Sequence, residues 1–95
     1  AKSSDYTLTG ADHTILIDCS SGNVTLTLPT AVGCAGRIYM IKRIDTTNNA
    51  ANINSNASEE IDGSTNPASV AALGSLTLQS DNSGWWKMAE YINPP

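Results

Sequence analysis

"NVTLTLP", residues 23–29, has the clearest structural pattern in the chain. Three apolar residues alternate with two threonines, and this period of two is typical of a β-strand with one buried face. Threonine suits the exposed face because β-branched side chains pack well on a pleated sheet. Pro29 should end the strand, since proline has no amide hydrogen to donate to a ladder. We therefore expect Leu26 and Leu28 to point into a hydrophobic core.

Similar alternation recurs outward from this segment in both directions. We expect further strands, bounded by turn-forming residues, at 6–9, 13–20, 36–45, 52–54, 75–80 and 85–91. "SVAAL" at 69–73 fits either a strand or a helical turn. No segment repeats apolar residues at helical spacing over three turns. The pattern predicts an all-β chain folded as a small antiparallel β-sandwich or barrel.

The segment "GRIYMIKRID", residues 36–45, has bulky side chains on both of its faces. Alternation places Ile38 and Met40 on one face, and Tyr39, Ile41 and Arg43 on the other. A strand with two bulky faces is often held between layers or subunits. We expect Ile38 and Met40 to join Leu26 and Leu28 in the core. The opposite face is then a candidate for a subunit contact.

Size and composition exclude several classes of function. The 95 residues form one small domain, 1–95, whose single core gives modest stability. The net charge of -4 argues against nucleic-acid binding, which requires clustered basic residues. No apolar run is long enough for a membrane span. Only 15% of the residues are charged, so the surface should be rich in Ser, Thr and Asn.

The sequence has no recognisable catalytic or metal-binding motif. His13 is the only histidine and has no cysteine at zinc-ligand spacing. The acidic segment at 59–62 does not match a calcium loop. We expect no enzymatic activity, no cofactor and no metal. Cys19 and Cys34 lack a C-x-x-C spacing, and free thiols and a disulfide both remain open, with free thiols favoured.

The two tryptophans are adjacent in "SDNSGWWKM", residues 80–88. In a strand, Trp85 shares a face with Lys87, whereas Trp86 points to the opposite face. One ring should therefore pack as scaffold, and Trp85 is the better candidate for contacting a partner. An alternative is a carbohydrate-binding module, in which Trp85, Tyr91 and the Asn-rich segment 48–56 bind a sugar.

Short motifs along the chain, in this order, resemble a small β-domain of bacteriophage virion proteins. That domain is found in tail fibres, tailspikes, head fibres and capsid-decoration proteins. The resemblance covers residues 6–88. Its matching positions are Leu28-Pro29, Gly36, Ile41-Lys42, Ile61-Asp62-Gly63, Asp81 and Trp85.

This resemblance implies a homotrimeric β-module on the virion surface, assembled in the bacterial cytoplasm. Its role would be host attachment or decoration of the capsid or tail, and it could be the C-terminal module of a longer fibre protein. Expected partners are other copies of the chain, other virion proteins, and a host-surface glycan or protein. The residues expected at subunit or partner contacts are Tyr39, Ile41, Arg43, Trp85, Lys87 and Tyr91.

Overall fold

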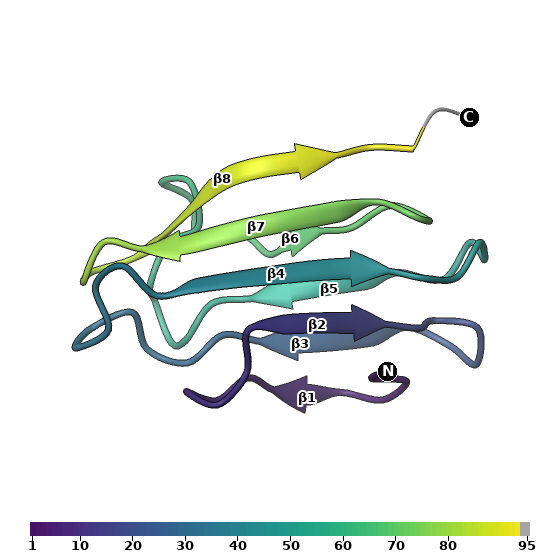
Figure 1. Ribbon diagram of the computed structural model, residues 1–95, viewed down its shortest axis with the longest axis horizontal. Helices are drawn as coiled ribbons and strands as arrows, with labels where there is room; N and C mark the ends of the chain where they lie inside the picture. Colours follow the sequence, from purple (N-terminus) through teal and green to yellow (C-terminus); the bar gives the residue numbers. More distant parts are fainter. Residues whose placement is uncertain (94–95) are drawn as a thin grey trace.

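The computed structural model describes residues 1–93, which contain eight strands and no helix (Figure 1). The strands form two four-stranded sheets that face one another as a sandwich. The predicted all-β fold is confirmed. No helix that could cross a membrane occurs in these residues. The strands are β1 (Tyr6–Thr7), β2 (Thr14–Ile17), β3 (Val24–Thr27), β4 (Ile38–Arg43), β5 (Ala51–Asn54), β6 (Ala68–Ser69), β7 (Ser75–Ser80) and β8 (Trp85–Tyr91).

The sheets are mixed rather than antiparallel. One sheet has the order β1-β3-β5-β6 and the other, which we call sheet A, has the order β2-β4-β7-β8. Three strand pairs are parallel, β1 with β3, β2 with β4 and β3 with β5. From β1 to β5 the chain passes from one sheet to the other at every connection, so sheet neighbours are two strands apart in sequence. The prediction of an antiparallel sandwich was wrong on this point.

The core lies between the two sheets. Alternate residues of β3 and β7 are buried, as the period of two in their sequences predicts. Leu26 and Leu28 are fully buried, and this prediction is confirmed. Ile61 is also buried and fixes the turn between β5 and β6 against the core.

The faces of β4 are the reverse of those predicted. Tyr39 and Ile41 are buried, whereas Ile38 and Met40 point outward with exposures of 37% and 46%. The buried face accepts polar residues because each finds partners inside the protein. The Tyr39 hydroxyl, for example, donates to the carbonyl oxygen of Thr9 over 2.8 Å.

Arg43 is buried next to Asp45 and organises the connection after β4. Its guanidinium group donates to both carboxylate oxygens of Asp45 over 2.9 and 3.0 Å. It also donates to the carbonyl oxygens of Val70 and Asn49. Asp45 accepts from the backbone amide of Cys19 as well. Because the guanidinium group stabilises the carboxylate, the pKa of Asp45 is far below its ordinary value.

The two cysteines are free thiols in separate surroundings. Cys19 is buried in the core, and burial raises the pKa of its thiol. Cys34 is partly buried and donates to the carbonyl oxygens of Thr30 and Ala31. Both therefore pack as small core or core-edge residues.

Candidate functional site

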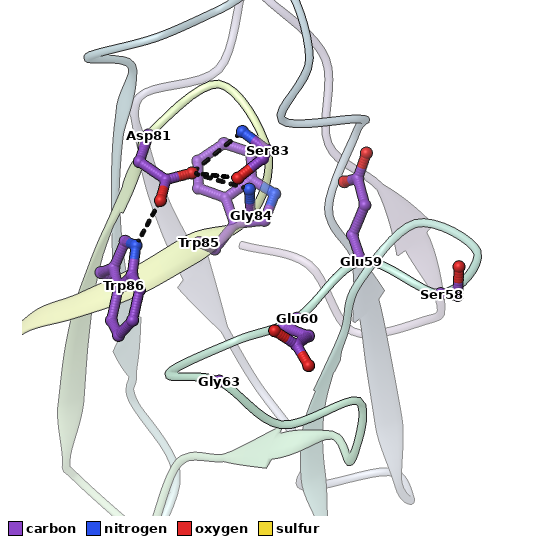
Figure 2. A pocket seen from close by; sticks show the side chains of 9 residues that line it. All are labelled: Ser58, Glu59, Glu60, Gly63, Asp81, Ser83, Gly84, Trp85 and Trp86. Atoms are coloured by element: carbon purple, nitrogen blue, oxygen red, sulfur yellow. Dashed lines mark hydrogen bonds between the residues drawn. The ribbon is translucent and has the colours of Figure 1, made fainter.

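The turn between β7 and β8 is organised by the carboxylate of Asp81. Its Oδ1 atom accepts from the backbone amides of Ser83 and Gly84 over 2.9 and 2.8 Å. Its Oδ2 atom accepts from the indole Nε1 of Trp86 over 2.7 Å (Figure 2). These hydrogen bonds hold the pKa of Asp81 well below its ordinary value, the Trp86 bond having the largest effect. The turn thus fixes the Trp86 ring by one edge.

The adjacent tryptophans point to opposite sides of sheet A, as alternation predicts. Trp85 is only 1% exposed and packs against Tyr39 with ring centroids 5.4 Å apart. Trp86 is 46% exposed. The choice of Trp85 as the partner-facing ring was wrong, because its backbone pairs with Glu60 and Ile61 and its ring fills the end of the core. Trp86 is the accessible aromatic residue.

A pocket of about 270 Å³ lies between this turn and the segment 58–63 (Figure 2). The Glu59 carboxylate is already used, since it accepts from the Ala31 amide and the Thr30 hydroxyl. Glu60 and Ser58 are exposed on the same wall. The residues that line the pocket are Ser58, Glu59, Glu60, Gly63, Asp81, Ser83, Gly84, Trp85 and Trp86.

One of the residues that line the pocket has a buried polar atom without a hydrogen-bond partner in the protein. Of the buried side-chain nitrogen and oxygen atoms in residues 1–93, Trp85 Nε1 alone has no hydrogen-bond partner. A buried donor without an acceptor costs about 1–3 kcal/mol of stability. Because this nitrogen is fully buried, it belongs to the core and is not a group that a ligand in the pocket can contact.

The charge of the pocket restricts what it could bind. Its lining includes the carboxylates of Glu59, Glu60 and Asp81 but no lysine, arginine or histidine. An anionic ligand would meet repulsion there. Within residues 1–93, no group of three or more His, Cys, Asp or Glu side chains could hold a metal ion. His13 is exposed and lies beside Thr14, away from this pocket.

The residues predicted for subunit or partner contact do not form one site. Four of them are buried in the core of the chain and are not available for a contact, so for these this interpretation was wrong: Tyr39, Ile41, Arg43 and Trp85. Lys87 and Tyr91 do reach the surface. The predicted sugar site from Trp85 and Tyr91 is not assembled either, since Trp85 points into the core and Tyr91 points outward.

A second candidate surface is the outer face of sheet A. Thr77 pairs with Met40, and Gln79 pairs with both Ile38 and Trp86, so these side chains share that face. Exposed apolar residues gather on it, and we call them the apolar face: Leu16, Ile38 and Met40. Trp86 lies at its turn end. Tyr91 lies at the opposite end of β8, with the Lys42 ammonium group 5.5 Å from its ring centroid.

Sequence reasoning missed Trp86 as the exposed ring and the apolar face as a surface. Alternation separates the two faces of each strand, but the face that is buried depends on what the opposite sheet offers. Alternation alone therefore does not show that Ile38 and Met40 point outward. No family model matches the sequence, and no curated protein is a significant match to it.

Proposed function

We propose that this chain is a non-enzymatic structural module of a phage virion, displayed on the particle surface as a homotrimer. The observation that carries the proposal is the apolar face of sheet A. Its role would be host attachment or decoration of the capsid or tail. The motif order from residue 6 to 88 supports the virion assignment as a resemblance.

The apolar face supports a subunit contact because its members are neighbours. Single exposed apolar residues are common on soluble proteins, but a contiguous patch is characteristic of an interaction surface. Met40 on β4 lies at its centre, with Leu16 on the adjacent β2 and Ile38 one pleat away. Burying such side chains contributes about 25 cal/mol per Å² of apolar surface. A small domain gains stability from this contact that its own core does not supply.

In the proposed assembly, three copies direct sheet A toward a common threefold axis. In a closed ring of three, rotational symmetry gives every copy the same contact with its neighbours. The second four-stranded sheet then forms the outside of the trimer, where Thr25, Thr27 and Asn52 are partly exposed. Such an uncharged polar surface agrees with the low charge content of the chain.

Sedimentation velocity at micromolar concentration tests the assembly. We expect a species of about 30 kDa, three times the 9.9 kDa chain mass. Met40→Lys should convert it to a monomer, because a charge at the centre of an apolar contact must be desolvated. Val32→Lys is the matched control, since Val32 is 60% exposed but lies in the β3–β4 connection.

The proposal fails if the wild-type chain sediments near 10 kDa at every concentration tested, or if Met40→Lys leaves the mass unchanged. The virion assignment has its own test. An antibody raised against the chain should label purified phage particles in electron micrographs. Absence of the chain from such particles, judged by mass spectrometry, would contradict the assignment while leaving the trimer intact.

A further inference from the structure

We propose that the pocket between the Asp81–Trp86 turn and the segment 58–63 binds a neutral monosaccharide unit of a glycan, with Trp86 as its stacking platform. Trp86 lies at the turn end of the apolar face, so this site borders the surface proposed for assembly. Three observations carry the inference, namely the fixed ring of Trp86, the free polar groups beside it and the size of the pocket.

The Trp86 ring is a flat apolar surface whose orientation is fixed before any ligand binds. Its nitrogen edge donates to Asp81 over 2.7 Å, so the ring is anchored while its face remains accessible. The apolar C–H face of a pyranose ring packs well on an indole face, whose π-system is electron-rich. Because Asp81 is itself held by Ser83 and Gly84, little rotational freedom of the ring remains to be lost on binding.

The polar groups next to this ring suit hydroxyl groups. Ser58 and Glu60 are exposed on the opposite wall, and a carboxylate accepts strong hydrogen bonds from hydroxyls. The lack of any basic residue in the lining disfavours phosphate, sulfate and acidic sugars. The ligand is therefore expected to be uncharged and rich in hydroxyl groups.

The size of the pocket limits the size of the ligand. Its volume of about 270 Å³ lies just below the roughly 300–1,000 Å³ of sites for drug-sized ligands, which suits one sugar ring rather than a chain.

The test is a titration of the ¹⁵N-labelled wild-type chain with methyl glycosides of glucose, galactose, mannose, rhamnose, N-acetylglucosamine and N-acetylgalactosamine. The two indole N–H resonances report the two tryptophans separately, and Trp86→Phe assigns them. We expect at least one sugar to shift the Trp86 resonance with a dissociation constant of roughly 1–10 mM. N-acetylneuraminic acid, an acidic sugar, should bind at least tenfold more weakly than that sugar.

Variants at Trp86 test whether the sugar stacks on the aromatic ring. Trp86→Ala should weaken binding by about tenfold or more, whereas Trp86→Phe keeps a ring and should stay within about threefold of wild type. Tyr91→Ala is the matched control, because it removes a similarly exposed ring from the other end of β8. Its dissociation constant should not change.

Three outcomes would overturn the inference. The first is that no sugar of the panel shifts either indole resonance at about 50 mM, well above the expected constant. The second is that Trp86→Ala binds as tightly as wild type. The third is that Trp86→Ala lowers the sedimenting mass, which would make Trp86 a subunit contact. None of these outcomes depends on whether Met40→Lys dissociates the trimer.

Discussion

Arg43 and Asp45 are two charged residues buried in a domain whose hydrophobic core is small. Neither side chain is more than 4% exposed, and each satisfies the hydrogen-bonding groups of the other. A buried pair of this kind adds little net stability compared with apolar residues, because both ions lose their hydration. Its role here is to fix geometry, since Arg43 also ties Val70 and Asn49 to the end of β4.

Removing one member of the pair should lower the free energy of unfolding by much more than the intact pair contributes to it. We expect Asp45→Ala to lower the free energy of unfolding by about 3–5 kcal/mol, because it leaves the Arg43 guanidinium buried without a counter-charge. Urea unfolding followed by tryptophan fluorescence measures the loss. Glu90→Ala, at an exposed position, should change stability by less than about 0.5 kcal/mol. Equal losses in the two variants would show that the pair is not a stability determinant.

The connection between β5 and β6 contains an alanine in a strained backbone conformation. Ala57 has φ 51°, a left-handed conformation that costs an L-residue about 1–2 kcal/mol and glycine almost nothing. Ala57→Gly should therefore be neutral or stabilising by up to about 1 kcal/mol, after the entropy that glycine adds to the unfolded chain is subtracted. Thermal unfolding at fixed protein concentration measures the change.

Ala35 provides the matched control for that substitution. It is also exposed and lies in a turn, but its φ is not positive. Ala35→Gly should therefore lose about 0.4–1 kcal/mol, because only the unfolded-state entropy changes. If both variants lose the same amount of stability, strain at Ala57 contributes nothing.

Most strands could be predicted from the sequence because alternation is a local property. β3 and β7 follow the expected pattern closely, whereas the short β6 shares only Ser69 with the segment 69–73 that fitted two interpretations. Strand direction is not local. Each connection from β1 to β5 crosses to the other sheet, and turn residues alone do not indicate whether a turn leads to the adjacent strand or across the layer.

The candidate site was harder to predict than the strands for a related reason. Alternation correctly separated Trp85 from Trp86, but their roles depend on contacts distant in sequence. Trp85 is buried because Glu60 and Ile61 pair with it, and Trp86 is fixed because the carboxylate of Asp81 reaches its nitrogen. Arg43 illustrates the same difficulty, since a lone arginine in a strand gives no indication that Asp45 and two carbonyl groups surround it.

Aspartate carboxylates accept side-chain hydrogen bonds at several places across the whole molecule. Tyr6 donates to Asp12, Ser20 to Asp18, Arg43 to Asp45 and Trp86 to Asp81. Each of these interactions favours the ionised carboxylate, and the pKa of each aspartate is lowered by it. With so few lysines and arginines, hydrogen-bond donors rather than cations supply most of this stabilisation.

These shifts predict how stability depends on pH. In the unfolded chain the aspartates titrate near pKa 3.9, above their values in the folded protein. Between the two values the unfolded state binds more protons, so the free energy of unfolding is highest above about pH 5 and falls as the pH is lowered. The buried carboxylate of Asp45 contributes a slope of up to about 1.4 kcal/mol per pH unit. Asp45→Asn should reduce the slope measured by urea unfolding from pH 5 to 2 at constant protein concentration. A slope that is zero, or that Asp45→Asn leaves unchanged, would mean that the buried carboxylate does not couple folding to pH.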